Sequence, residues 1–259
     1  MARFTGKVAI VTGASTGLGP LMSKMLAEEG ARVVLAARRL ELVEEAARGL
    51  GAAALAVKAD VTQEADVAAM VDAAMSEWGQ VDILMNNAAQ PGTDLYIWEQ
   101  TLENWNNTLA VDTTAAMLCA REVLRRSMLE RRSGAILNFS SVTGWNGMVR
   151  KSHYTTAKAG LRALTKVIAL EAGPHGVRCN CVVPGPIDNE LFASYLQRTA
   201  DRDGVTYEEK RGEALNWSPL KAMSTNEDVA NLALFLASDA ARTITGQSVN
   251  VDGGIVMLG

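Results

Sequence analysis

Seven short apolar runs alternate along the chain with longer and more polar stretches. The runs lie at Val8–Val11, Val33–Ala36, Ala54–Val57, Ile83–Met85, Ile136–Phe139, Cys179–Val183 and Ser248–Val251. Most of these runs are nearly continuous in their apolar character, which is typical of strands buried on both faces of a sheet. The pattern therefore predicts seven buried strands.

The stretches between these runs are rich in Ala, Leu, Glu and Arg, which are strong helix formers. They predict helices at Leu21–Glu29, Leu40–Leu50, Glu64–Trp78, Thr113–Arg131, Thr156–Ala172 and Asn226–Ser238. Regular alternation of strands and helices predicts a doubly wound (Rossmann) α/β fold, with a parallel seven-stranded sheet covered by helices on both faces. No flexible linker interrupts residues 1–259, so we expect a single domain.

One segment, residues 188–226, departs from this rhythm. It follows a Pro-Gly-Pro turn, carries many charges and includes the apolar side chains of Leu191, Phe192, Tyr195 and Leu196. A long insertion beyond the carboxyl end of a strand often serves as a lid or binding loop. We expect a substrate lid here; a helical hairpin packed on the surface is the alternative.

The composition excludes several classes of partner. The net charge of −4 provides no basic field for nucleic acid or an anionic membrane, and no apolar run approaches the ~20 residues that span a bilayer. The amino-terminal apolar stretch is too short for a secretory signal peptide. The cysteines, Cys119, Cys179 and Cys181, have no histidine at metal-ligand spacing, so we expect buried free thiols in a cytoplasmic protein without a metal site.

The first apolar run ends in a glycine-rich turn that precedes a predicted helix. The turn reads Thr12-Gly13-Ala14-Ser15-Thr16-Gly17-Leu18-Gly19. Such a turn lets the backbone approach a pyrophosphate, whose charge is favoured by the amino end of the following helix. This context favours a dinucleotide site over a tight turn without a ligand.

The second apolar run ends without an acidic residue. In a dinucleotide fold, an acid at this place holds the ribose 2′-hydroxyl, whereas an arginine nearby accommodates a 2′-phosphate. Here Arg38 and Arg39 follow the run, and guanidinium groups suit bidentate contacts with phosphate. This pattern favours NADP(H) over NAD(H). The alternative is that both arginines are solvated residues at a helix start.

Three residues suggest acid–base chemistry. Tyr154 and Lys158 are four residues apart in a helical stretch, so they share one face of the helix. A nearby cation stabilises a phenolate, which makes a tyrosine usable as a general acid or base. Ser141 follows the run Ile136–Phe139, at the strand end that faces a ligand crevice, where its hydroxyl could bind a carbonyl oxygen.

Together, these motifs resemble the short-chain dehydrogenase/reductase family over essentially the whole chain. The shared motifs are Thr12-Gly13…Gly17…Gly19, Asp60-Val61, Asn86-Asn87-Ala88, Ser141, Tyr154…Lys158, Pro184-Gly185 and Gly246…Asp252-Gly253-Gly254. The resemblance implies that Tyr154 donates a proton to the substrate oxygen and that Ser141 orients that oxygen. It also implies that Lys158 lowers the pKa of Tyr154 and binds the nicotinamide ribose.

The resemblance implies further cofactor contacts. Adenine would contact Asp60 and Val61, Asn87 and Ala88 would pack along the cofactor, and the nicotinamide would be placed by Pro184, Gly185 and Ile187. It also implies a homotetramer built from helices near 101–131 and 153–172 and from the last strand.

Three positions depart from the family pattern. Ala89 replaces a glycine, and Asn189 replaces a threonine that commonly touches the carboxamide. Asp112 replaces an asparagine that supports a proton path to the lysine, in part through its backbone. We expect the backbone to carry this role, which would make Asp112 harmless. Alternatively, its carboxylate stabilises the charged form of Lys158 and weakens the help that this lysine gives to Tyr154.

The sequence therefore predicts an NADP(H)-dependent oxidoreductase that interconverts a carbonyl compound and an alcohol. A non-catalytic NADP-binding sensor or scaffold and an NAD-dependent hydroxy-acid or polyol dehydrogenase are the alternatives. A dehalogenase-like enzyme is disfavoured, because the glycine loop is intact. His153 is expected at the surface or on a cleft wall, and Tyr96, Trp98, Trp145 and Met148 either line a substrate pocket or pack between loops.

Overall fold

The computed structural model describes residues 2–257 and contains a parallel sheet of seven strands in the order β3-β2-β1-β4-β5-β6-β7. The strands are β1 Val8–Thr12, β2 Arg32–Ala37, β3 Ala54–Lys58, β4 Ile83–Asn86, β5 Gly134–Phe139, β6 Val177–Pro184 and β7 Ser248–Val251. The order reverses between β1 and β4, as in a doubly wound α/β fold. The predicted fold class and all seven strands are confirmed.

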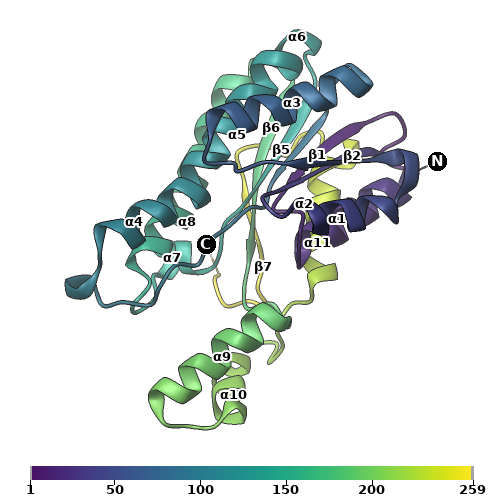
Figure 1. The fold of residues 1–259 in the computed structure, drawn as a ribbon. Helices are drawn as coiled ribbons and strands as arrows, with labels where there is room; N and C mark the ends of the chain where they lie inside the picture. Colours follow the sequence, from purple (N-terminus) through teal and green to yellow (C-terminus); the bar gives the residue numbers. More distant parts are fainter. Residues whose placement is uncertain (1, 258–259) are drawn as a thin grey trace.

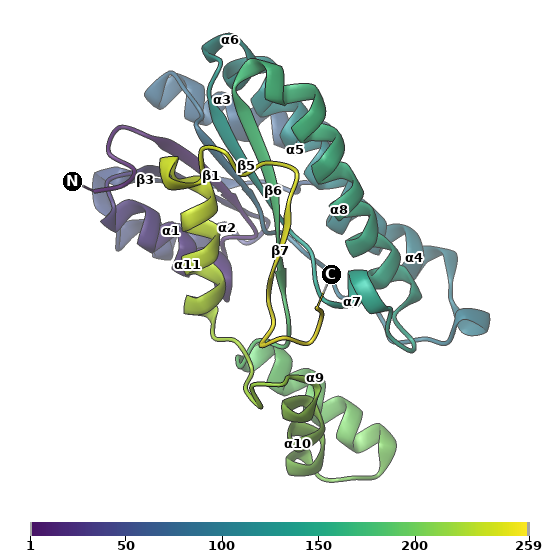
Figure 2. The ribbon, with the colours of Figure 1, turned by 180° about the vertical axis from the view of Figure 1, so that it is seen from behind.

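Helices cover both faces of this sheet (Figures 1 and 2). They are α1 Leu18–Glu28, α2 Leu40–Arg48, α3 Glu64–Trp78, α4 Leu102–Leu109, α5 Ala115–Val123, α6 Leu129–Arg131, α7 Thr143–Asn146, α8 Ser152–Ala172, α9 Glu190–Asp203, α10 Tyr207–Trp217 and α11 Asn226–Ala237. One apolar core joins the sheet to α1, α2 and α11, and a second joins it to α3, α5 and α8.

Burial on both faces explains the continuous apolar runs. In β1, Ala9 and Val11 belong to the core under α1, whereas Val8 and Ile10 belong to the core under α3. Successive side chains of a strand point to opposite faces, so both sets must be apolar when both faces are covered.

One long helical segment differs from its prediction. The sequence pattern places its start at Thr113, but α4 begins at Leu102, with Thr101 capping it by accepting a hydrogen bond from the Asn104 backbone N–H at 3.1 Å. Two π-helical turns, Ala110–Thr114 and Leu124–Met128, join α4, α5 and α6. The segment 102–109 is mostly polar, so it lacked the apolar periodicity on which the prediction depended.

The segment 188–226 forms a pair of helices, α9 and α10, which projects beyond the sheet in Figure 1. The turn between them is stabilised by Thr206 and Glu209, which satisfy each other's backbone N–H groups, and by an ion pair of 3.1 Å between Lys210 and Asp203. The hairpin shape is therefore as the alternative interpretation described it.

The three cysteines are buried and free, on α5 and β6. Burial raises the pKa of the Cys119 thiol to about 12 and that of Cys181 to about 11, and it also raises the pKa of Cys179. Within residues 2–257, no helix combines the length and the apolar composition needed to cross a bilayer.

Candidate active site

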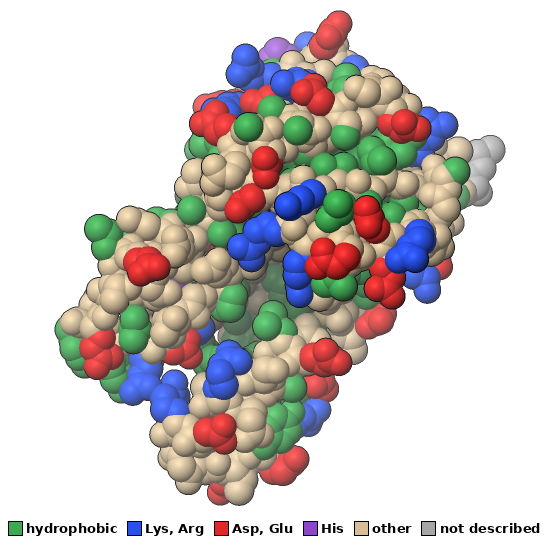
Figure 3. Space-filling view, in the orientation of Figure 1, with side chains coloured by type: hydrophobic (Ala, Val, Ile, Leu, Met, Phe, Trp, Pro, Cys, Tyr) green, Lys and Arg blue, Asp and Glu red, His purple; other side chains and the backbone are tan. Residues whose placement is uncertain are grey.

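The predicted catalytic residues lie at the carboxyl edge of the sheet. Ser141 follows the end of β5, whereas Tyr154 and Lys158 occupy the first two turns of α8. This helix begins at Ser152, four residues before the predicted start, so Tyr154 lies inside it. Figure 3 shows a hollow between the main body and the α9–α10 pair, with apolar side chains inside it and Lys and Arg side chains on its rim.

Lys158 is held between β5 and α8. Its Nζ donates a hydrogen bond of 3.0 Å to the carbonyl oxygen of Phe139, and the hydroxyl of Ser140 donates one of 2.8 Å to the Lys158 carbonyl. The Nζ lies 5.3 Å from the centre of the Tyr154 ring. The end of β5 thus fixes the ammonium group beside the phenol.

Asp112 contacts this lysine directly. Its Oδ2 lies 3.1 Å from Lys158 Nζ, and both side chains are buried. Its Oδ1 accepts a hydrogen bond of 2.6 Å from the backbone N–H of Gln90. Asp112 lies in the first π-helical turn, between α4 and α5. The carboxylate thus forms the contact with the lysine that the alternative interpretation describes, while the expectation that the backbone carries the role of residue 112 in catalysis stays a prediction.

The ion pair changes the acid–base properties of all three groups. Burial lowers the pKa of Lys158 and is the largest single effect, but Asp112 and Tyr154 together outweigh it and the pKa is raised. Burial raises the pKa of Asp112 against the opposing charge of Lys158. For Tyr154, burial raises the pKa, the Lys158 charge lowers it, and the Asp112 charge raises it again. Asp112 therefore offsets part of the help that Lys158 gives to Tyr154.

The glycine loop is tight toward the protein and open on its outer side. A Cβ on Gly13 would lie 2.8 Å from the Cα of Ala88, whereas Gly17, with a φ of +65°, has open space around it. The hydroxyl of Thr12 accepts hydrogen bonds of 3.1 Å from the backbone N–H groups of Asn87 and Ala88. Helix α1 begins at Leu18, so Gly19 lies in its first turn. This cradle fits a pyrophosphate.

Arg38 and Arg39 differ in their contacts with the glycine loop. Arg39 donates a hydrogen bond of 3.0 Å to the hydroxyl of Ser15 and one of 3.4 Å to that of Thr16. Arg38 is exposed beside it. The structure thus joins one arginine to two hydroxyls of the glycine loop, a group of donors suited to a phosphate.

The remaining predicted cofactor residues line the same edge. Asp60 follows β3 and accepts hydrogen bonds from the backbone N–H and the hydroxyl of Thr62, at 3.0 and 2.8 Å. Val61 next to it is buried. Residues 184–187 follow β6, with Gly185 packed closely against Asp252 and Ile187 bridged to Ser224.

Asn189 is occupied within the chain. Its Oδ1 accepts a hydrogen bond of 3.0 Å from the backbone N–H of Phe192 at the start of α9, and its Nδ2 donates one of 3.1 Å to Asn226. In this structure it acts as the N-cap of α9, where its polar groups satisfy the helix start.

The structure also places the imidazole and aromatic side chains near the candidate site. His153 is fully buried, so its expected place at the surface or on a cleft wall is wrong. Trp98 is exposed and stacks on Tyr96, whereas Met148 lies 3.9 Å from the hydroxyl of Tyr195 on α9. Met148 and Tyr195 thus meet between the main body and the helix pair. Trp145 instead donates a hydrogen bond of 3.1 Å to Asn250.

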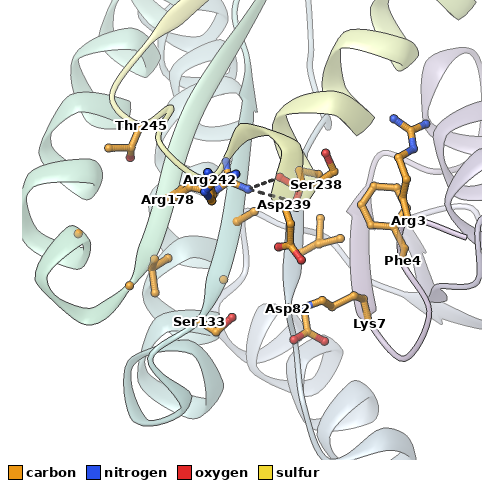
Figure 4. Close-up of a pocket in the computed structure, with 17 residues that line it drawn as sticks. Arg3, Phe4, Lys7, Asp82, Ser133, Arg178, Ser238, Asp239, Arg242 and Thr245 are labelled. Carbon is orange, nitrogen blue, oxygen red and sulfur yellow. Dashed lines mark hydrogen bonds between the residues drawn. The ribbon is translucent and has the colours of Figure 1, made fainter. Parts of the chain in front are cut away.

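A pocket of about 290 Å³ lies at the opposite, amino edge of the sheet (Figure 4). Among the residues lining it, Arg178 donates hydrogen bonds to the backbone carbonyls of Leu236, Ala237 and Ser238 at the end of α11. Asp82 accepts one from the Val8 backbone and pairs with Arg131. Arg178 thus holds the end of α11, and Asp82 holds the start of β1, so both residues have a structural role at this edge. No three His, Cys, Asp or Glu side chains of residues 2–257 gather as metal ligands would.

Comparison with known proteins gives consistent matches over nearly the whole chain. A sequence profile described as Enoyl-(Acyl carrier protein) reductase matches residues 13–256. The chain is 38% identical over 255 residues to cis-4-hydroxycyclohexanecarboxylate dehydrogenase of Sinomonas cyclohexanicum, with 97% of each protein covered. It is 33% identical over 255 residues to 3-oxoacyl-(acyl-carrier-protein) reductase of Staphylococcus epidermidis, with 97% of this chain and 99% of the relative covered.

A solved structure, that of NAD⁺-bound xylitol dehydrogenase, shares the fold with a TM-score of 0.92 and 26% sequence identity. The match covers 97% of this chain and all of the other. Both the sheet and the edge that carries Ser141, Tyr154 and Lys158 therefore lie within the compared region.

Proposed function

Because the chain belongs to the short-chain dehydrogenase/reductase family and is an oxidoreductase of CH–OH groups, we propose that it interconverts a ketone and a secondary alcohol with NADP(H). The observation that carries the proposal is the convergence of Ser141, Tyr154 and Lys158 at the carboxyl edge of the sheet, beside the open glycine loop. A serine, a phenol and an ammonium group together bind and protonate a carbonyl oxygen.

The nicotinamide cofactor supplies or accepts the hydride when it is bound. The chain's own residues handle the oxygen and its proton. Ser141 donates a hydrogen bond that orients and polarises the carbonyl oxygen, and Tyr154 delivers a proton to it during reduction and removes one during oxidation. Lys158 stabilises the phenolate of Tyr154 that remains after the proton has left.

NADP(H) is the proposed cofactor because of the group formed by Arg39, Ser15 and Thr16, with Arg38 exposed beside it. A 2′-phosphate would receive charge-assisted hydrogen bonds from such a group, whereas a 2′-hydroxyl would use little of it. The NAD⁺-bound xylitol dehydrogenase motivates the competing assignment of NAD(H). In our proposal, Asp60, Val61, Asn87, Ala88 and residues 184–187 line the rest of the cofactor site.

For the substrate, we propose a small ketone or secondary alcohol. The relatives are named for a hydroxycyclohexanecarboxylate, a 3-oxoacyl thioester and xylitol, which share such a group and differ in everything around it. The test is a screen of these three classes with NADPH and NADH in both directions. Turnover of one class that disappears in a Tyr154→Phe variant supports the proposal. Tight cofactor binding with no turnover of any class would favour the non-catalytic sensor.

We also propose that α9 and α10 form a lid over the substrate. Arg202 on α9 lies 4.0 Å from Asp94, a residue of the main body that also pairs with Lys151. Lys151 Nζ is 5.4 Å from the Tyr195 ring on α9 and 5.9 Å from the Tyr154 ring. The helix pair is therefore tied to the neighbourhood of the catalytic tyrosine.

We further propose that the protein is a homotetramer and that it is located in the cytoplasm. Leu102, Met117, Val167 and Leu170 are large apolar side chains on α4, α5 and α8, and all are exposed in the isolated chain. Exposed apolar groups on neighbouring helices suit a subunit interface. The free cysteines suit a reducing compartment. Sedimentation of the purified protein would show the assembly.

An Asp112→Asn variant tests how far the buried carboxylate limits Tyr154. Because the Asp112 charge raises the pKa of Tyr154, its removal should lower that pKa. The rate of alcohol oxidation should then reach its alkaline plateau at a lower pH than in the parent enzyme. An unchanged pH profile would contradict this account.

The matched control is Asp112→Ala, which removes the partner of Lys158 without leaving a polar side chain. Loss of one partner of a buried ion pair costs about 3–5 kcal/mol, so thermal unfolding should occur at a clearly lower temperature. Asp112→Asn should lose less stability, because its amide can still accept the Gln90 hydrogen bond.

A further inference from the structure

His153 precedes the catalytic tyrosine and is fully buried, yet the proposed reaction does not use it. Its Nε2 lies 3.0 Å from the carbonyl oxygen of Pro91, and its Nδ1 lies 2.7 Å from Nε2 of Gln100. Gly92 packs so closely that a Cβ there would lie 2.6 Å from Cδ2 of the imidazole. A buried imidazole in such close contact must have each nitrogen matched to its partner.

The neighbouring amides determine where the proton of His153 lies. The backbone N–H of Thr93 donates to Oδ1 of Asn104 at 2.8 Å, and Nδ2 of Asn104 donates to the Thr93 carbonyl at 3.1 Å, so the Asn104 amide has one possible orientation. The same Nδ2 donates to Oε1 of Gln100 at 2.7 Å. The Gln100 nitrogen therefore faces Nδ1 of His153 as a donor.

It follows that Nδ1 of His153 accepts a hydrogen bond and that Nε2 carries the proton. The Nε2–H group then donates to the Pro91 carbonyl, which can only accept. The imidazole is thus neutral, with a single compatible tautomer. A second proton on Nδ1 would face the donor group of Gln100.

Pro91 and Gly92, which contact this histidine, belong to the loop 90–95, and this loop connects to the catalytic centre. The Gln90 backbone N–H donates to Asp112, Asp94 pairs with Lys151, and the Leu95 N–H donates to the Arg150 carbonyl at 3.1 Å. The loop is therefore fastened at one end to the partner of Lys158 and at the other to the start of α8.

We propose that His153 is a positioning residue: its neutral form anchors the loop 90–95 and so holds the Gln90 amide on Asp112, and protonation of Nδ1 releases this anchor. The consequence for catalysis rests on the proposed function, since Asp112 acts on Tyr154 through Lys158. Carbonyl reduction starts from the protonated form of Tyr154, so this residue contributes no acid limb in that direction. The rate of carbonyl reduction should therefore fall at low pH only as His153 takes up a proton, and this fall is the acid limb that tests the proposal. The loop and the Gln90 hydrogen bond should change with this protonation.

Several groups act on the titration of His153. Burial lowers its pKa, and its hydrogen bond to Pro91 opposes this effect. Lys151, at the start of α8, lowers the pKa further, whereas the carboxylates of Asp94 in the loop and Asp112 in the π-helical turn raise it. The pKa lies below its usual range as a net result, so the neutral form is the one present near neutral pH.

The direct test is a pH titration by NMR of the full chain labelled with ¹⁵N. The chain has two histidines, and a His175→Asn variant removes the other imidazole signal. We expect the Nε2–H tautomer for His153, and an amide signal of Gln90 that moves with the same midpoint as the imidazole. The Nδ1–H tautomer, or a Gln90 signal indifferent to that midpoint, would overturn the proposal. Neither result depends on turnover, so they separate this proposal from the proposed function.

Gln100→Glu supplies the complementary variant. A carboxylate at position 100 would accept a hydrogen bond from the Nδ1–H of the imidazolium and stabilise that charged form. It should therefore move both the NMR midpoint and the acid limb of carbonyl reduction upward by about one pH unit or more. His153→Asn keeps an acceptor near the place of Nδ1 but cannot titrate, so it should lose this acid limb. His175→Asn should leave the limb in place. If Gln100→Glu moves the NMR midpoint but leaves the acid limb of an active enzyme unchanged, the proposed link to catalysis is wrong.

Discussion

Replacing Tyr154 with phenylalanine should lower turnover by about 10²–10⁴-fold, the contribution typical of one positioned acid–base group. The substitution removes the hydroxyl and keeps the ring, which lies 5.3 Å from Lys158 Nζ and 5.9 Å from Lys151 Nζ. Packing should therefore survive, and cofactor binding should stay close to that of the parent. Steady-state turnover with the substrate found in the screen, together with nicotinamide fluorescence for binding, measures both quantities.

Tyr207→Phe is the matched control, because it makes the same chemical change on α10, outside the group formed by Ser141, Tyr154 and Lys158. It should change turnover by a few-fold at most. If Tyr154→Phe kept more than a tenth of the parent turnover, another group would have to deliver the proton and the proposed mechanism would fail.

Removing the guanidinium of Arg39 should weaken NADPH binding by about 10–100-fold and leave NADH binding nearly unchanged. The estimate follows from the loss of one hydrogen bond to a charged group, at about 1.5–3 kcal/mol, with a factor of ten for each 1.4 kcal/mol. Titration of an Arg39→Ala variant with each reduced cofactor, followed by nicotinamide fluorescence, measures the effect. Adding Arg38→Ala shows whether the exposed neighbour shares the phosphate.

Arg48→Ala provides the control for a general loss of positive charge. Arg48 lies in the last turn of α2, on the helix that begins directly after Arg39, and contacts the Glu44 carbonyl instead of the glycine loop. This variant should bind both cofactors as the parent does. A parent enzyme that binds NADH more tightly than NADPH would refute the assignment of NADP(H) and favour the NAD-dependent alternative.

The strands could be predicted because double-sided burial leaves a direct trace in the sequence. Every residue of β1 is buried, so the run Val8–Val11 is apolar throughout. Helix α3 was likewise predicted at its observed bounds, Glu64–Trp78. The start of α4 at Leu102 was not predicted, because the first two turns of this helix are mostly polar. The π-helical turns that follow leave no comparable pattern in the sequence.

In the candidate site, too, some residues could be predicted from the sequence and some contacts could not. Ser141, Tyr154 and Lys158 could be located because each is tied to a predicted strand end or helix. The contact between Asp112 and Lys158 could not, since it depends on how a π-helical turn meets α8. The contacts of His153 could not be predicted for a similar reason, because its hydrogen-bond partners, Pro91 and Gln100, are more than 50 residues away in the sequence.

The rate at which the buried cysteines react with thiol reagents measures how often this part of the protein unfolds. Thiol reagents attack the thiolate, and Cys119, Cys179 and Cys181 are all buried and free with raised pKa values. Labelling must therefore wait until α5 or β6 opens. The rate at which a disulfide reagent consumes these thiols then reports how often the centre of the sheet is exposed, without any added probe.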